Sequence, residues 1–152
     1  MSENKFIGAW KLVSFTKKSS DGQISYPYGP EAGGYIIYAK EGVMSATIMR
    51  ADREPIGMPW EELNKGKSFW SKLKYFPAVL RYVNAAQNYL SYCGPYEIDD
   101  KKITYHVLVC LLPDWLGKDL IRYYEFTANF LILSAKDAEG ASFELRWERI
   151  GQ

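Results

Sequence analysis

Residues 92–112, YCGPYEIDDKKITYHVLVCLL, contain two runs of β-branched and aromatic residues on either side of a polar turn at 99–101. This pattern is typical of an antiparallel hairpin. In an extended second strand His106 and Cys110 share one face, whereas Tyr105 and its apolar neighbours share the other. His106 is the only histidine of the 152-residue chain, so the face that it occupies bears directly on function.

The same alternation predicts strands on both sides of this hairpin. Two more hairpins turn around Gly42 and near Asn129, where short polar or glycine-containing segments interrupt the apolar runs. Single strands are predicted near the two ends of the chain. The stretches are FIGAWKLVSFT (6–16), GYIIYAKEGVMSATIMR (34–50), DLIRYYEFTANFLILSA (119–135) and SFELRWERI (142–150).

Eight antiparallel strands in consecutive hairpins favour a meander, and its two edges are hidden when the sheet closes on itself. We therefore predict a mainly β fold, a closed eight-stranded antiparallel barrel. A two-sheet sandwich is the alternative. The interior of an eight-stranded barrel is filled by side chains or holds one small ligand.

A helical insertion at about 59–91 is expected between the third and fourth strands. The apolar period lengthens there, and Pro77 is placed to open the main helix. An earlier helix is expected to begin at Pro59 and to end at Gly66. Lysines alternate with aromatic residues over 63–77, which suits a lid over the barrel mouth or a surface on an anionic membrane. The residues expected on one helical face are Val79, Val83, Ala86 and Leu90.

The bulk composition predicts a single domain covering 1–152. The net charge is +1 and the basic residues are scattered, which excludes the charge pattern of a nucleic-acid binder. Cys93 and Cys110 lack metal-ligand spacing, so neither a metal nor another cofactor is expected. No apolar run is long enough for a transmembrane helix, and no secretory signal is recognisable. A cytoplasmic location with both thiols free is the resulting expectation.

Residues 6–14, FIGAWKLVS, resemble the Gly-x-Trp opening shared by lipocalins and fatty-acid-binding proteins. Further pieces, in matching order, resemble the lipocalin-like domain family of bacteria and fungi. The resemblance implies a calycin-type barrel with a central cavity, but it says little about activity because fold alone does not define function. The pieces are GYIIY (34–38), GVMSA (42–46), MRADR (49–53), GPYEID (94–99), TYHV (104–107), PDWLG (113–117), RYYE (122–125) and LRWER (145–149).

The resemblance also implies how one end of the barrel is closed. In lipocalins an arginine of the last strand lies over the indole, a cation–π contact worth roughly 0.5–2 kcal/mol. Gly8, Trp10 and Arg149 are expected to form this closure. Arg146 is the alternative to Arg149, because the sequence leaves the phase of the last strand open.

The candidate ligand-binding residues start from the opening hairpin. If His106 faces the cavity, Arg122 on the paired strand can share it, with Tyr96 and Tyr124 as further polar contacts. The alternative is an imidazole that is hydrogen-bonded to a neighbour or faces solvent. The full predicted set is His106, Arg122, Tyr124, Tyr96, Ser45, Arg50 and Trp115.

We predict that the barrel binds one small, largely apolar molecule whose polar head lies near His106 and Arg122. The first alternative is a cofactor-independent isomerase or cyclase of a natural-product-like pathway, with His106 as general acid or base. The second is a protein-interaction module, including a homo-oligomer. His106 and Cys110 cannot form a nucleophilic pair, because four strand residues separate them by about 13 Å.

Overall fold

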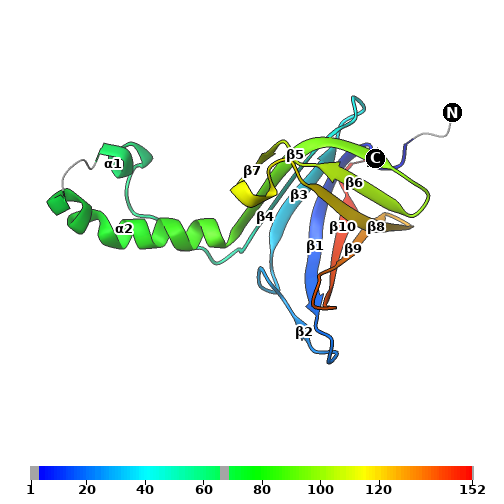
Figure 1. The fold of residues 1–152 in the computed structure, drawn as a ribbon, viewed down its shortest axis with the longest axis horizontal. Helices are drawn as coiled ribbons and strands as arrows, with labels where there is room; N and C mark the ends of the chain where they lie inside the picture. Colours follow the sequence, from blue (N-terminus) through cyan, green and yellow to red (C-terminus); the bar gives the residue numbers. More distant parts are fainter. Residues whose placement is uncertain (1–3, 66–68, 152) are drawn as a thin grey trace. The chain divides into compact units, whose positions relative to one another are not determined.

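The computed structural model describes residues 4–65 and 69–151. They belong to two compact units: one contains the chain up to Ala51 and from Leu90 onward, and the other contains Asp52–Tyr89. The first unit is a β-barrel and the second is helical (Figure 1).

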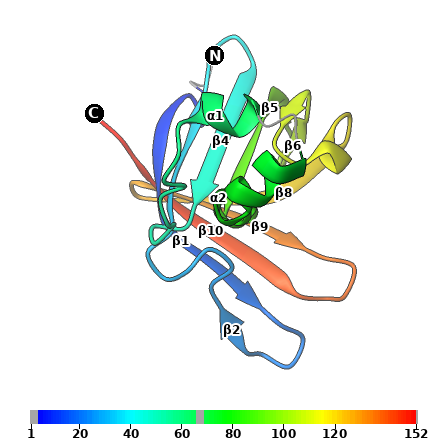
Figure 2. The ribbon, with the colours of Figure 1, turned by 90° about the vertical axis from the view of Figure 1, so that its left-hand side faces the viewer.

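Eight long antiparallel strands form the barrel wall (Figures 1 and 2). They lie in the order β10-β9-β8-β6-β5-β4-β3-β1, and β10 also pairs with β1, which closes the sheet. The predicted closed eight-stranded barrel is therefore confirmed. The strands are β1 (Gly8–Lys18), β3 (Gly33–Tyr38), β4 (Val43–Met49), β5 (Tyr89–Ile98), β6 (Lys102–His106), β8 (Asp119–Thr127), β9 (Phe130–Lys136) and β10 (Ser142–Arg149).

Residues 102–112 do not form one continuous strand, contrary to the sequence-based expectation. The strand ends at His106, and a Cβ atom on Gly94 of the paired strand would lie 1.8 Å from the His106 carbonyl oxygen. A glycine at position 94 permits this close approach, and the register shifts by one residue here, from Tyr96–Tyr105 to Cys93–Val109, as in a β-bulge. The short elements of the barrel unit are β2 (Ile24–Ser25), which pairs with β1, β7 (Val109–Cys110), which pairs with β5, and the 3-10 helix η1 (Pro113–Trp115).

The inward side chains of the strands pack into one hydrophobic core. Burial alternates along most of the strands, as a pleated wall requires, and in β1 a register shift between Leu12 and Ser14 interrupts the alternation. In β6, for example, Ile103 and Tyr105 are buried, while Thr104 and His106 between and beyond them are partly exposed. The four largest fully buried side chains are all aromatic: Trp10, Trp147, Tyr38 and Tyr105.

The helical unit lies between β4 and β5, the third and fourth long strands, as predicted. It contains α1 (Trp60–Lys65) and α2 (Phe69–Gln87). Pro77 lies inside α2, so the prediction that it opens the helix is wrong. Proline removes its own N–H donor at a cost of about 3 kcal/mol, and residues on both sides keep the helix intact. Leu90 belongs to β5 instead of the helix, and Gly66 lies outside the described residues.

One face of α2 packs on the segment that precedes α1. Ala78 is buried, Arg81 lies 4.0 Å from the carboxylate of Glu54, and Arg53 donates a hydrogen bond of 3.4 Å to the carbonyl of Ala85. Ala78, Arg81 and Ala85 recur at helical spacing, which defines this face. Neither helix, as far as its residues are described, has the length and apolar character needed to cross a membrane.

Candidate functional site

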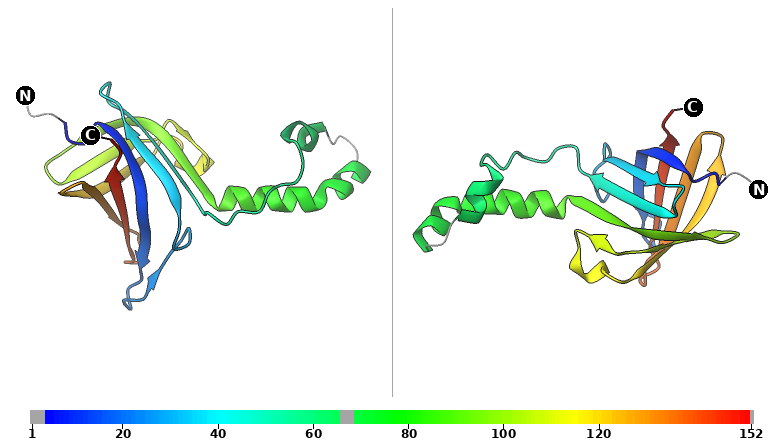
Figure 3. Two further views of the ribbon diagram at one scale, coloured as in Figure 1. Left: turned by 180° about the vertical axis from the view of Figure 1, so that it is seen from behind. Right: turned by 90° about the horizontal axis from the view of Figure 1, so that it is seen from above.

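β1 starts and β10 ends at the same end of the barrel (Figure 3). Trp10 and Arg149 close this end. The Arg149 guanidinium carbon lies 4.1 Å from the centre of the Trp10 ring, and the indole N–H donates to the carbonyl of Phe6 at 2.8 Å. Arg149 also donates to the carbonyls of Ile7 and Lys5. Of the two arginines considered from the sequence, Arg149 therefore makes the contact.

The local geometry explains why the Gly-x-Trp pattern requires a glycine at position 8. Gly8 has a φ of 122°, and a Cβ atom on it would lie 3.2 Å from a guanidinium nitrogen of Arg149. A side chain at this position would be strained and would crowd the arginine. Arg146, on the outer face of β10, lies over the Phe130 ring at 3.9 Å instead.

Aromatic side chains fill the interior next to this closure. Phe6 makes edge contacts with Tyr38, Tyr124 and Phe126, with ring centroids 4.8–5.2 Å apart. The hydroxyl of Tyr124 donates to the carbonyl of Asp99 at 2.9 Å. We call this region, comprising Phe6, Trp10, Arg149, Tyr124 and Phe126, the filled end. Tyr124, predicted to bind ligand, is part of this packing.

Tyr96 lies at the same end. Its hydroxyl donates to the carbonyl of Ala39 at 3.1 Å and accepts from the side-chain amide of Asn4 at 3.3 Å. Its ring lies 5.2 Å from that of Tyr38. Tyr96 thus connects the segment before β1 to the barrel wall.

The opposite end contains a cavity of about 540 Å³, and we call this region the hollow end. A cavity of this size is in the range of small-molecule sites. Two of the predicted residues, Arg122 and Trp115, line it. The lining consists of Phe15, Pro27, Tyr28, Ile48, Leu90, Tyr92, Trp115, Leu120, Arg122, Ala135, Lys136, Asp137, Phe143 and Leu145.

Arg122 is the cation that projects inward from the wall. It alternates with exposed residues of β8, and Leu120 on the same side also lines the cavity. Burial raises the pKa of the Tyr92 hydroxyl, while the charge of Arg122 and a hydrogen bond from it oppose that rise. The ring of Trp115 meets the Tyr92 ring edge-on at 5.8 Å. Arg122, Tyr92 and Trp115 therefore form one group.

A pair of tyrosine hydroxyls lies in the core of the same unit. The oxygens of Tyr38 and Tyr105 are 2.5 Å apart. Burial raises the pKa of both hydroxyls above the usual tyrosine range, so both remain protonated at neutral pH.

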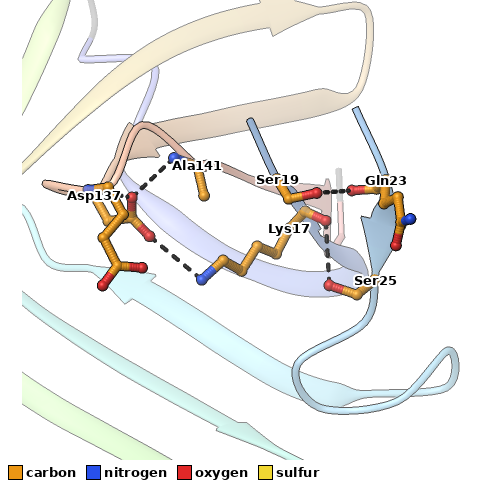
Figure 4. Close-up of polar contacts among 7 residues, drawn as sticks. Lys17, Ser19, Gln23, Ser25, Asp137 and Ala141 are labelled. Carbon is orange, nitrogen blue, oxygen red and sulfur yellow. Dashed lines mark hydrogen bonds and ion pairs between the residues drawn. The ribbon is translucent and has the colours of Figure 1, made fainter. Parts of the chain in front are cut away.

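An ion pair at the rim of the cavity joins β1 to the segment that follows β9 (Figure 4). Lys17 of β1 lies 3.3 Å from the carboxylate of Asp137, which also accepts hydrogen bonds from the backbone N–H groups of Glu139 and Ala141. Burial by itself would raise the pKa of Asp137, but the bond from Ala141 and the contact with Lys17 lower it. Asp137 is thus an ionised carboxylate with both oxygens in polar contacts.

His106 lies on the outside of the barrel. Its Nδ1 is 2.7 Å from Asp119 and its Nε2 is 3.6 Å from Glu97, and one third of its side chain is exposed. Because His106 pairs with Asp119 and Ile103 pairs with Arg122, His106 and Arg122 occupy opposite faces of the wall. The predicted polar cluster of these two residues is therefore wrong, and so is the placement of His106 as a base in the cavity.

Two other predicted residues lie away from the described lining. Ser45 alternates with buried Met44 and Ala46, so it faces outward from β4. Arg50 follows the end of β4 and is half-buried. The two thiols are free, and no described group of three histidine, cysteine or acidic residues is arranged to hold a metal ion.

Sequence reasoning missed Tyr92, Lys136 and Asp137. The sequence did contain a signal for Tyr92. In β5 it lies two residues after Leu90, on the same apolar face, and such a face points inward in a barrel. The same rule applied to β6 places Tyr105 inside and His106 outside. Lys136 ends β9 and Asp137 follows it, and neither residue carries a comparable signal.

A closed antiparallel barrel with one packed end and one internal cavity is the architecture of the lipocalin-type barrels. The family model of the lipocalin-like domain matches residues 7–150, and the chain belongs to this family. The resemblance inferred from the sequence is confirmed. No curated protein matches the chain.

Several solved structures are similar in fold. An uncharacterised protein from Bacteroides eggerthii has 15% identity and a TM-score of 0.43, over 93% of this chain and 98% of that one. A variant of the fluorescent protein UnaG has 10% identity and a TM-score of 0.43, over 97% and 98%. A de novo designed fluorescence-activating β-barrel has 12% identity and a TM-score of 0.42, over 95% and 94%.

Proposed function

We propose that this protein binds one small, largely apolar molecule inside the hollow end of its barrel. The observation that carries the proposal is the cavity of about 540 Å³ with a mainly apolar wall and one inward arginine. Ligand sites usually combine such a wall with a few polar groups that orient the ligand. Membership in a barrel family with a central cavity supports the same assignment.

The apolar lining supplies the binding energy in this proposal. Phe15, Tyr28 and Phe143 form one aromatic side, with Phe15 stacked on Tyr28 at 5.5 Å. Burial of apolar ligand surface contributes roughly 25 cal/mol per Å², so even a small hydrocarbon body is retained. The filled end prevents a ligand from extending further, because aromatic rings occupy that part of the interior.

A change in cavity volume tests the proposal. Ala135 lines the cavity, whereas its neighbour Ser134 alternates to the outer face. Ala135→Trp should occupy the site and abolish binding of the neutral fluorescent probe N-phenyl-1-naphthylamine, while Ser134→Trp should keep the wild-type affinity within about twofold. Saturable one-to-one binding by wild type, measured by fluorescence titration, is the required starting point. Equal affinity of both variants would reject the cavity as the site.

Native mass spectrometry of freshly purified protein adds an independent measurement. A discrete mass excess that disappears on denaturation is expected if a cellular ligand co-purifies. The released molecule then defines the ligand class.

The helical unit suggests a second candidate, self-association. Five apolar side chains on one side of α2 are 42–60% exposed: Leu73, Phe76, Val79, Leu80 and Val83. A contiguous exposed apolar stripe commonly marks an interaction surface. In this proposal a second copy of the chain covers it, and Leu80→Glu should shift a concentration-dependent mass in sedimentation experiments to that of the monomer. The prediction of a lid made from this unit stays a prediction.

A further inference from the structure

The hollow end holds hydrogen-bond donors that have no acceptors. Arg122 carries five N–H donors, and one of its terminal nitrogens donates to the carbonyl of Ile121 at 2.9 Å. The other guanidinium N–H groups of Arg122, and the hydroxyl proton of Tyr92 in the same lining, are available to a ligand.

Hydrogen-bond donors also outnumber acceptors deeper in the barrel. Only one proton can lie between the hydroxyl oxygens of Tyr38 and Tyr105, so the second proton of this buried pair needs another acceptor. Trp147 occupies the next inward position of β10 after Leu145, which lines the cavity. Its indole N–H is the one buried side-chain polar atom, among the described residues, without a hydrogen-bond partner. A buried donor without a partner costs about 1–3 kcal/mol, so such groups commonly meet a ligand or water.

Acceptors are scarce in the same region. Asp137 is the one carboxylate in the described lining, and its oxygens already receive Lys17 and the N–H groups of Glu139 and Ala141. Arg122 is therefore an inward-facing cation in a described lining whose single carboxylate is already paired with Lys17. A ligand that brings donors or a positive charge would therefore face donors and positive charge.

We propose that the molecule bound in the hollow end carries a carboxylate, and that Arg122 is its counter-ion. This inference rests on the proposed function and specifies the ligand class. A carboxylate accepts hydrogen bonds without donating any, and its two oxygens match the planar guanidinium fork. Tyr92 lines the same cavity as Arg122, and its hydroxyl is a further donor for this group. The apolar remainder of the ligand lies against Phe15, Tyr28 and Phe143.

The position of the arginine strengthens the effect. Arg122 lies between Leu120 and Tyr124 on the inward side of β8, so one side of it is the cavity and the other is the aromatic packing of the filled end. Water is less able to screen an ion pair there than on the outer surface. Lysine would not replace it, since a single ammonium lacks the two parallel donors.

A matched pair of probes tests the proposal: cis-parinaric acid and its methyl ester, which share one hydrocarbon chain and differ only in the charged head. We expect the wild-type protein at pH 8 to bind the acid about 10- to 100-fold more tightly than the ester in fluorescence titrations, as for one charge-assisted contact. Arg122→Gln should remove this preference by lowering the affinity for the acid. Arg146→Gln, which alters an arginine on the outer face, should keep the preference.

The outcomes separate the inference from the function on which it rests. Equal binding of acid and ester by the wild-type protein overturns the carboxylate assignment and leaves cavity binding standing. Failure of both probes and of N-phenyl-1-naphthylamine rejects cavity binding itself. The ratio of acid to ester affinity is measured on the wild-type protein, so it tests the carboxylate assignment even if Arg122→Gln does not fold. Tyr92→Phe, which keeps the charge and removes one donor, should then reduce the ratio about threefold to tenfold.

Discussion

The filled and hollow ends of the barrel are built from the same strands but differ in what occupies the interior. β1 carries Trp10 at the filled end and Phe15 at the hollow end. At the filled end the segment before β1 turns back, so that Phe6, only 2% exposed, lies among the aromatic rings. At the hollow end the segments outside the long strands contribute Tyr28 and Trp115 to the wall, and a cavity of about 540 Å³ remains.

The difference indicates that the two ends of the barrel contribute differently to stability and to ligand binding. Dense aromatic packing and the Trp10–Arg149 contact at the filled end stabilise the closed sheet. Unmatched donors such as Trp147 would reduce stability if they stayed unpaired, and their occurrence in the core suggests a ligand instead of optimal packing. Substitutions at the filled end should therefore affect folding, and those at the hollow end should affect binding.

The largest expected effect comes from Trp10→Ala at the filled end. Trp10 is 2% exposed, so its removal leaves a large cavity and should lower the free energy of unfolding by about 3–5 kcal/mol. Phe143→Ala at the hollow end should cost only about 1–2 kcal/mol, because this ring is half-buried beside an existing cavity. Urea denaturation followed by tryptophan fluorescence and circular dichroism gives both values. Similar losses for the two variants would contradict the proposed difference between the two ends.

A smaller effect is expected from the arginine at the closure. Arg149→Met keeps an apolar side chain but loses the cation–π contact and the hydrogen bonds to Ile7 and Lys5, a loss of about 2 kcal/mol in the free energy of unfolding. Arg146→Met is the matched control on the same strand. Its contact with Phe130 is exposed to solvent and should contribute no more than about 1 kcal/mol. If both substitutions lower the free energy of unfolding by the same amount, Arg149 does not stabilise the filled end more than an exposed arginine would.

Much of the filled end was predictable from the sequence. The alternating runs, the turns at Gly42 and Asn129, and the need to hide sheet edges led to a closed barrel. Gly8 and Trp10 identified the closing contact through resemblance to a known opening. What the sequence left open was the strand phase, and the register of Trp10 with Arg149 resolves it.

The hollow end was harder to predict because its polar residues come from three strands and from segments outside the strands. Arg122 and Trp115 were named, but Tyr92 was not, and His106 was placed inside. A one-residue difference in phase exchanges the two faces of a strand, and a lone histidine attracts a functional interpretation. The close approach of Gly94 to His106, where the register shifts, depends on two strands at once and has no signal in either alone.

The smallest expected effect concerns His106, on the outer surface near the hollow end. Asp119 chiefly, with Glu97, raises the pKa of His106 above its ordinary value by hydrogen bonding and charge. A raised folded-state pKa means that protonated His106 stabilises the folded protein below about pH 6.5, and that this contribution is lost as pH rises through the higher folded value. The difference in unfolding free energy between wild type and His106→Gln should therefore shrink with increasing pH, measured by urea denaturation between pH 5 and about pH 9.

The same variant also tests which end of the barrel, and which face, binds ligand. Because His106 lies outside, His106→Gln should leave the affinity for cis-parinaric acid within about twofold, whereas Arg122→Gln should lower it at least tenfold. Glu97→Gln, which removes the weaker partner, should reproduce part of the pH effect on stability and leave binding unchanged. A tenfold loss of affinity in His106→Gln would mean that the imidazole reaches the ligand, and the assignment of Arg122 as the sole charged contact would then have to be abandoned.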